Sequence, residues 1–270
     1  MTTVEVVGDL TAGEGGEGGD PDVVVASRVP ARPTLAVERR LWRAGHRWVA
    51  GMDEVGRGAW AGPLSVGVAV LHPGVRSRSM PFWLRDSKAL PEERREEVFP
   101  AVARWCADGA VGHASAEECD RWGMTLAWRF AACRALACLE VVPDAIVIDG
   151  PFDFLRAIRA ESADATDRAA EPPVEGTTAL AVALPDAPIP AVVLPVVRAD
   201  ATCGAVAAAS ILAKVVRDRV MRAESEHYPA YGFDRNKGYP STRHQIALRG
   251  YGLSAIHRRS WAYTAGLPWS

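Results

Sequence analysis

Short apolar runs rich in β-branched residues recur along this chain, separated by longer segments with helical character. The runs "RWVAGMDEV" and "SVGVAVLHP" are joined by a glycine-rich turn, which predicts a β-hairpin. Three further strands are predicted at "GAVGHASA", "DAIVIDG" and "AVVLPVVRAD". Helices are predicted at "SKALPEERREEVFPAVARWCADG" (Ser87 as N-cap, Pro91 near its first turn), "TLAWRFAACRALACL" and "GAVAAASILAKVVRDRVMRAESE". Strands first, and then strands alternating with helices, predict an α/β domain with a mixed sheet.

Two acidic segments stand apart from this pattern. Residues 1–30 are rich in glycine and carry six acids against one arginine, so we expect a disordered tail. Residues 157–190, rich in alanine, proline and acids, are expected to form an insertion that projects into solvent. The rest of the predicted domain, residues 31–270, carries 28 basic and 21 acidic side chains outside that insertion. This positive excess is compatible with a phosphate-rich partner, although the whole chain has a net charge of −2.

Cysteine usage and hydropathy bear on the compartment. The five cysteines form no CxxC pair and no even framework, which indicates reduced thiols and a cytoplasmic protein. No apolar run reaches the length of a membrane span, and the acidic N-terminus does not resemble a signal peptide. We also expect a monomer, because no apolar stripe is left over once the core segments are assigned.

Acidic residues interrupt or end three of the apolar strands. Asp53 and Glu54 lie in the first strand, Asp149 ends "AIVID", and Asp200 ends "VVLPVVRAD". Each has an ordinary alternative: Asp149 as a turn residue, Asp200 as a helix N-cap, and Asp53 and Glu54 as neighbours on opposite strand faces. A carboxylate in an apolar strand is unfavourable unless it is paired or metal-bound. Three such sites together favour a shared hard cation such as Mg²⁺ or Mn²⁺.

Lysine is rare in this chain, and its positions suggest a use. The sequence has 28 arginines but only three lysines: Lys88, Lys214 and Lys237. A compact ammonium group binds phosphate as a point charge, so all three are candidate substrate-binding residues. Tyr239, two residues after Lys237, either stacks on a sugar or base or packs a loop. The segment "HRRSW" at 257–261 is a basic cluster, for which a solvated face or a helix C-terminus is the ordinary alternative.

The glycine-rich segment "GRGAWAG" excludes two phosphate-binding motifs. Its spacing is G-x-G-x-x-x-G and a strand follows it, so the dinucleotide fingerprint fails, and no Walker A motif is present. An unrelated Mg²⁺-dependent phosphotransferase is possible on the carboxylates alone. That alternative leaves Gly56 and Gly58 without an explanation.

Together these motifs closely resemble ribonuclease HII, the bacterial type 2 ribonuclease H. The matching strings run from about Pro33 to Trp261, with one interruption at the insertion. They are "DEVGRGAWAGP", "RDSKAL", "VIDG", "RADATCGAVAAASILAKVVRDR", "YGFDRNKGYPSTRHQIALRGYG" and "HRRSW". Arginine-for-lysine usage and the acidic insertion resemble those of a high-GC actinobacterial member. The resemblance implies a ribonuclease H-like fold, with a central mixed five-stranded sheet flanked by helices and a helical C-terminal extension.

The resemblance also implies an activity and a metal site. The implied enzyme is an endonuclease that hydrolyses RNA in RNA–DNA hybrids. It also nicks duplex DNA 5′ to embedded ribonucleotides, leaving 3′-hydroxyl and 5′-phosphate ends. Asp53, Glu54, Asp149 and Asp200 match the family's carboxylates for a two-metal Mg²⁺ or Mn²⁺ site. Local backbone geometry or the second ion is expected to bring Glu54 toward the others.

The substrate contacts are implied in the same way. The backbone of Gly56, Arg57 and Gly58 matches the tripeptide that reads the ribose 2′-hydroxyl, and close approach to a ribose leaves no room for a side chain at either glycine. Tyr239 matches the tyrosine that stacks on the neighbouring deoxyribose at the RNA-to-DNA junction. The substrate-binding assignment of the three lysines comes from phosphate-facing motifs.

Two positions depart from the family pattern. "RAD" replaces the usual Lys-Gly-Asp around Asp200, which affects local loop geometry. Trp60 replaces a smaller residue or proline, and we expect it to alter substrate contact nearby.

Two other functions remain open. A ribonuclease HIII-like enzyme shares the chemistry and acts on continuous hybrids, but that family carries a folded N-terminal domain for which residues 1–30 are too short and polar. A catalytically inactive nucleic-acid binder is expected to have lost at least one of the four carboxylates. All four are present.

Overall fold

The computed structural model describes residues 24–25, 32–84, 90–156 and 184–266. Its centre is a mixed sheet with strand order β1-β6-β5-β2-β3-β4. Strands β2, β5 and β6 run parallel, whereas β2, β3 and β4 pair antiparallel, which confirms the hairpin and the mixed sheet. The strands are β1 (Val24–Val25), β2 (Val49–Val55), β3 (Leu64–Leu71), β4 (Asp108–Ala114), β5 (Ala145–Asp149) and β6 (Val192–Val197).

A two-residue strand, β1, lies within the N-terminal segment that we expect to be disordered. Val24 and Val25 pair in parallel with Val196 and Val197, so the body of five strands gains a sixth at its edge. The edge of β6 offers backbone groups for pairing, and β-branched residues favour extended backbone there. Residues 1–23 and 26–31 lie outside the described residues.

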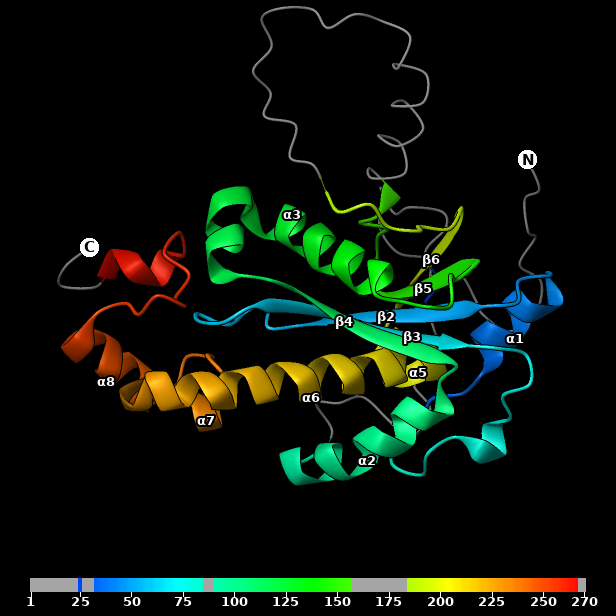
Figure 1. Ribbon diagram of the computed structural model, residues 1–270, viewed down its shortest axis with the longest axis horizontal. Coiled ribbons are helices and arrows are strands. Elements are labelled where there is room, and N and C mark those ends of the chain that lie inside the picture. The colour runs from blue at the N-terminus through cyan, green and yellow to red at the C-terminus, as the bar shows by residue number, and fades with distance from the viewer. Residues whose placement is uncertain (1–23, 26–31, 85–89, 157–183, 267–270) are drawn as a thin grey trace, which may run out of the picture.

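Helices cover both faces of the sheet (Figure 1). Helix α3 packs against one face, and α6 packs against the other with α2 beside it. The segments after α6 form the predicted helical C-terminal extension. The helices are α1 (Ala36–Arg43), η1 (Ser77–Ser79), α2 (Glu92–Trp105), α3 (Ala116–Ala137), α5 (Ala199–Thr202), α6 (Gly204–His227), η3 (Pro229–Tyr231), α7 (Phe233–Asn236), α8 (Thr242–Tyr251) and η4 (Ala262–Gly266).

Two helix starts differ from the prediction. Helix α3 begins well before the predicted apolar segment, at a capping box in which Ser115 and Glu118 satisfy each other's backbone amides. Its first turns are polar, and Gly123, with φ of +76°, interrupts the helical spacing there, so the apolar pattern does not reveal them. Pro91 occupies the N-cap position of α2, and the predicted cap Ser87 lies outside the described residues.

The C-terminal part of the acidic insertion packs on the core. Leu184, Ala187 and Ile189 lie against the hydrophobic cluster between the sheet and α3. This part therefore does not project into solvent as predicted, because its apolar side chains gain from burial. The rest of the insertion, residues 157–183, lies outside the described part of the chain.

Helix α6 approaches the sheet closely because small residues line the contact. A Cβ atom on Gly51 would lie 2.1 Å from the Ala205 carbonyl carbon, and one on Gly67 would lie 2.3 Å from the Ala209 carbonyl oxygen. These contacts fix α6 against β2 and β3. They also orient the face of β2 that carries Asp53, two residues after Gly51.

The thiol prediction is confirmed, because all five cysteines are free and four of them are buried. Among the described residues, no helix has the length and apolar character needed to span a membrane.

Candidate active site

Parallel strands β2 and β5 bring two of the predicted acids to the same edge of the sheet. Met52 of β2 pairs with Ile148 of β5, so Asp53 and Asp149 are the next residues on adjacent strands. Neighbouring strands lie about 4.8 Å apart, and paired positions share a face of the sheet. The two carboxylates therefore lie side by side on the face that α6 covers.

Asp200 reaches this edge through the short helix α5. The Ala199 amide donates a hydrogen bond of 2.7 Å to Asp149 Oδ1, and Asp200 is the next residue. Asp200 is 7% exposed and lies inside α5, whose N-cap is Arg198, so its interpretation as a helix cap is wrong. Arg198 has a left-handed φ of +61°, which non-glycine residues rarely adopt. The left-handed residue of "RAD" is therefore Arg198, and Ala199, which stands in place of the usual glycine, lies inside α5.

Glu54 is placed differently from the other three acids. Side chains alternate along a strand, so Glu54 points to the α3 face while Asp53 points to the α6 face. Regular pairing continues through this point, with Glu54 opposite Val66 and Val55 opposite Ser65. The backbone therefore does not turn Glu54 toward the other acids, so of the two expected means only the second ion is left.

The carboxylates fit a hard divalent cation in kind and location. All donors are oxygens, and Asp53 is only 4% exposed, an unfavourable place for an uncompensated charge. As the side chains stand, no three or more His, Cys, Asp and Glu residues in the described ranges are arranged to hold a metal ion. Asp53 Oδ1 instead accepts the Glu54 amide at 2.8 Å, and Asp149 Oδ1 accepts the Ala199 amide. The carboxylate oxygens are therefore suitable ligands for such a cation, but in these rotamers they are not grouped to coordinate one.

The two glycines of the Gly56–Gly58 turn, directly after β2, have different explanations. Gly56 has a φ of +87°, and a Cβ atom there would lie 2.2 Å from Arg217 Nε and 2.7 Å from the Pro63 carbonyl oxygen. Packing inside the protein therefore requires this glycine, which corrects the explanation by ligand approach alone. At Gly58 a Cβ atom would meet only the edge of the Tyr239 ring, at 4.0 Å. The exposed surface at Gly58 thus remains available to a ligand.

Tyr239 lies directly beside this turn. The Gly56 amide donates a hydrogen bond of 3.2 Å to the tyrosine hydroxyl, and the Arg217 guanidinium lies 5.6 Å from the ring centroid. The ring is half-buried, so part of it stays accessible. The structure therefore brings together the two motifs for which the family resemblance implies ribose and junction recognition.

Two buried histidines support the Tyr239 loop. His244 Nδ1 lies 3.0 Å from the Tyr239 carbonyl oxygen, and its Nε2 lies 2.9 Å from His257 Nε2. His257 Nδ1 in turn accepts the Ser254 amide at 2.9 Å. Burial lowers the pKa of both rings, that of His257 to about 3. Both therefore remain neutral near pH 7, and the interpretation of "HRRSW" as a solvated basic segment is wrong for His257.

Lys214 is held inside the protein. Its ammonium lies 2.5 Å from Asp218, whose second carboxylate oxygen lies 3.2 Å from Arg95. Burial lowers the pKa of Lys214, and its partner Asp218 is almost fully buried. This ion pair on α6 gives the lysine a structural role, and the contact does not present it to a phosphate. Lys88 lies outside the described residues.

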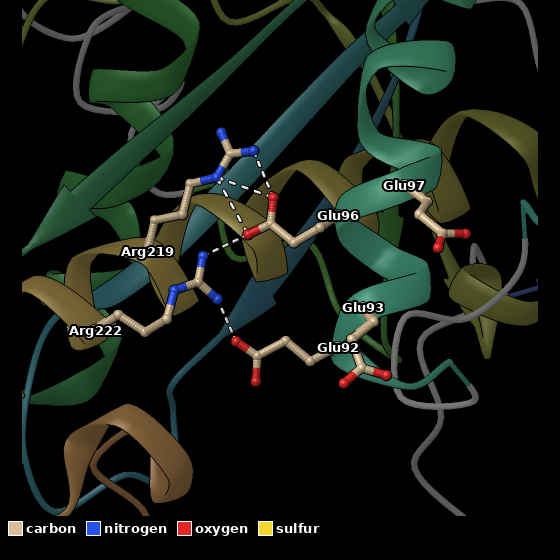
Figure 2. A pocket seen from close by; sticks show the side chains of 6 residues that line it. All are labelled: Glu92, Glu93, Glu96, Glu97, Arg219 and Arg222. Atoms are coloured by element: carbon tan, nitrogen blue, oxygen red, sulfur yellow. Dashed lines mark hydrogen bonds and ion pairs between the residues drawn. The ribbon is translucent and has the colours of Figure 1, made fainter.

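Lys237 joins a cluster of charges between α2 and α6. Its buried ammonium lies 2.9 Å from Glu92. Figure 2 shows Arg219 and Arg222 of α6 directed at Glu96 and Glu92 of α2, across the hollow that these side chains line. Lys237 therefore ties the segment before Tyr239 to α2. The structure does not display it as a phosphate contact.

Trp60 packs into the C-terminal extension. Its ring stacks on Tyr263, with centroids 4.2 Å apart and planes inclined by 10°. Its amide donates to the Gly238 carbonyl at 2.8 Å, and its carbonyl accepts the Arg258 amide at 2.8 Å. Trp60 thus joins the glycine-rich segment to the extension. The expected effect on substrate contact does not follow from this placement.

The sheet, the flanking helices and the acidic strand ends define a ribonuclease H-like nuclease. The crystal structure of ribonuclease H2 from Pyrococcus horikoshii OT3 has a similar fold, with a TM-score of 0.62 and 29% identity, covering 81% of this chain and 95% of that one. The family model described as ribonuclease HII matches residues 50–264.

Two curated relatives agree with that match. The ribonuclease HII of Streptomyces coelicolor is 41% identical over 237 residues, which cover 87% of this chain and 86% of the relative. The ribonuclease HII of Rhodococcus opacus is 39% identical over 249 residues, which cover 92% of this chain and 93% of the relative. The chain belongs to the ribonuclease HII family. It is a metal-dependent endoribonuclease with ribonuclease H activity on RNA–DNA hybrids.

Proposed function

We propose that this enzyme also nicks duplex DNA 5′ to single embedded ribonucleotides, leaving 3′-hydroxyl and 5′-phosphate ends. The observation that carries the proposal is the hydrogen bond between Gly56 and Tyr239. It joins the turn assigned to ribose recognition to the ring assigned to the neighbouring deoxyribose. A substrate with one ribonucleotide followed by DNA presents both groups at this place at once.

Asp53, Asp149 and Asp200 are the proposed metal ligands, with Glu54 as the fourth. Bound Mg²⁺ or Mn²⁺ in a two-metal site supplies an activated water and stabilises charge on the leaving 3′-oxygen. Asp53 and Asp149 each accept a backbone amide through Oδ1, which helps to hold these two carboxylates at the shared edge of the sheet. Glu54 would reach the site from the α3 face, around the end of β2.

The exposed turn supplies the proposed specificity for RNA. Gly58 leaves the backbone accessible, and a backbone amide can bond the 2′-hydroxyl that DNA lacks. Arg57 is exposed, and its guanidinium carbon lies 5.2 Å from the centroid of the Trp128 ring of α3. This cation–π contact directs the Arg57 side chain toward α3. We assign Lys214 and Lys237 an indirect part, through the ion pairs that hold α6 and the Tyr239 loop. For Lys88, phosphate binding stays a prediction, as do the monomeric state and the cytoplasmic location.

A panel of three duplexes of one sequence tests this proposal. One carries a single ribonucleotide, one has a continuous RNA strand, and one is all DNA. We expect cleavage of the first two with Mg²⁺ or Mn²⁺ and none of the third. Cleavage of the continuous hybrid alone would favour a ribonuclease HIII-like enzyme. Cleavage of neither would contradict the proposal and favour a nucleic-acid binder.

A further inference from the structure

We propose that Arg258 is a positioning residue for ribose recognition, because it sets the orientation of the Arg57 and Gly58 amides from inside the protein. This inference rests on the proposed function, in which the backbone of the Gly56–Gly58 turn reads the 2′-hydroxyl. It adds the residue that holds this backbone in the orientation needed for reading.

Arg258 is fully buried, and its guanidinium donates hydrogen bonds to backbone carbonyls of the glycine-rich loop. Its Nη1 donates to the Arg57 carbonyl at 2.9 Å. Its Nη2 donates to the carbonyls of Gly56 at 2.7 Å and Gly62 at 3.2 Å. Burial lowers the pKa of Arg258, but a guanidinium remains charged in proteins. Charge-assisted hydrogen bonds of this kind are roughly twice as strong as neutral ones.

The direction of these carbonyls determines where the amides point. In a planar trans peptide unit, the carbonyl of one residue and the N–H of the next point in opposite directions. The Gly56 carbonyl points inward to Arg258, so the Arg57 N–H points away from it. By the same argument the Arg57 carbonyl turns the Gly58 N–H outward. Arg57 and Gly58 are both exposed, so two adjacent donors face the outer surface of the turn.

Two fixed donors at this surface suit an oxygen acceptor. Donors that are oriented before binding need no reorganisation when the ligand arrives, and so recognise it more strongly. The 2′-hydroxyl of a ribose is such an acceptor, and its absence from DNA makes the contact selective. Gly58 has no side chain that could partly cover these two backbone donors.

A second buried arginine holds the rest of this loop. Arg217 donates to the carbonyls of Pro63 at 2.8 Å, Ala61 at 3.2 Å and Lys237 at 2.9 Å. Of these two arginine side chains, only Arg258 donates hydrogen bonds to carbonyls of the Gly56–Gly58 turn. Its planar fork reaches two successive carbonyls, whereas a lysine ammonium is a single point of charge. Arg258→Lys therefore keeps the charge and loses the bridging of the turn.

The test compares Arg258→Lys with Arg259→Lys, both in the cleavage-deficient Asp53→Asn background. Arg259 is the neighbouring arginine, is exposed, and uses its backbone amide to bond Asp120. Equilibrium binding is measured in Mg²⁺ for a duplex with one ribonucleotide and for the all-DNA duplex of the same sequence. We expect Arg258→Lys to reduce the preference for the ribonucleotide by about tenfold, a loss equivalent to one or two hydrogen bonds. All-DNA affinity should stay within about twofold, and Arg259→Lys should change neither quantity by more than that.

The outcomes separate this inference from the function on which it rests. A ribonucleotide preference that survives Arg258→Lys contradicts the positioning role and leaves the proposed function intact. A parent protein with no preference at all contradicts the proposed function itself. Equal losses on both duplexes by a folded Arg258→Lys protein indicate general damage to the surface and also contradict the positioning role.

A second measurement decides the question if Arg258→Lys does not fold. Amide hydrogen exchange of Arg57 and Gly58 is followed in the Arg258-containing Asp53→Asn protein, bound to each duplex in turn. Slower exchange of both amides with the ribonucleotide duplex than with all DNA supports outward donors that bond the ribose. Equal exchange with the two duplexes contradicts the inference.

Discussion

The Tyr239 hydroxyl accepts a hydrogen bond from the Gly56 amide at 3.2 Å, across 183 positions of sequence. The Arg217 guanidinium that contacts the tyrosine ring also bonds the Pro63 carbonyl, at the far side of the glycine-rich loop. Ring and turn are therefore parts of one rigid assembly. A substrate bound at the turn as we propose would therefore lie next to this ring.

Tyr239→Ala tests whether this ring reads the RNA-to-DNA junction. We expect cleavage at a single embedded ribonucleotide to fall more than cleavage of a continuous hybrid, because the deoxyribose next to the ribonucleotide loses its stacking partner. Tyr239→Phe keeps the ring and loses one hydrogen bond, so its kcat/KM should fall by only about fivefold. Steady-state kinetics on both substrates measures the effect. Equal losses on the two substrates would argue against junction reading.

Asp53→Asn tests the carboxylate edge. Replacing one proposed metal-binding oxygen with an amide should lower kcat by more than about 100-fold while duplex affinity stays nearly unchanged. Calorimetric titration with Mn²⁺, without nucleic acid, should show weakened binding. Asp144→Asn is the matched control, because Asp144 lies at the opposite end of β5 and bonds the Arg47 and Trp48 amides. A variant with near wild-type turnover would remove Asp53 from the site.

The two glycines of the turn should respond differently to alanine. Gly56→Ala forces a side chain into a left-handed backbone against Arg217, so we expect a loss of about 1–3 kcal/mol in unfolding free energy. Gly58→Ala should change that free energy by less than about 1 kcal/mol and still lower kcat/KM on ribonucleotide substrates. Denaturant unfolding and steady-state kinetics test the pair. Wild-type kcat/KM in Gly58→Ala would show that no ligand approaches there.

The strands, the hairpin and the acids at the strand ends could be predicted from sequence because all three follow from local patterns. Apolar runs identify the strands, and parallel strands end at a shared edge, so Asp53 and Asp149 had to lie near each other. The start of α3 could not be found in this way, since Gly123 and the polar residues around it carry no apolar period. The strand at Val24–Val25 depends on pairing with β6, which the short run of valines at 23–25 does not reveal by itself.

Burial of charged residues was the part that sequence did not disclose. Arg258 and Arg259 are adjacent and identical in type, yet the first is fully buried and the second is exposed. Arg217 is likewise one arginine among 28 until the fold surrounds it with carbonyls. Rarity of lysine pointed to Lys214 and Lys237, but their ammonium groups are held by Asp218 and Glu92. The type of a residue and its rarity in the sequence do not determine where the charged group of a long side chain lies in the fold.

Glu38 should make the stability of the fold depend on pH. It is fully buried, one oxygen accepts the Ala205 amide at 2.7 Å, and the other has no hydrogen-bond partner among the described residues. Burial raises its pKa from 4.5 to about 7. Between these values the folded protein binds more protons than the unfolded chain. The contribution of Glu38 to the free energy of unfolding is therefore complete below about pH 4.5 and is lost as the pH rises through 7.

Glu38→Gln removes this titration. We expect the variant to have a higher Tm than the wild type at pH 8, because it no longer buries a charge, with the difference shrinking toward pH 5. Thermal unfolding of both proteins across this range measures the difference directly. A difference that is constant with pH would show that Glu38 does not titrate in this window.

The position of the cut tests the central claim most directly. A DNA duplex with one embedded ribonucleotide, labelled on that strand, is incubated with the protein and Mg²⁺ or Mn²⁺, with EDTA as the control. We predict a single nick immediately 5′ to the ribonucleotide, a 3′-hydroxyl that a polymerase can extend, and no product in EDTA. A nick on the 3′ side of the ribonucleotide, or cleavage that persists in EDTA, would contradict the account.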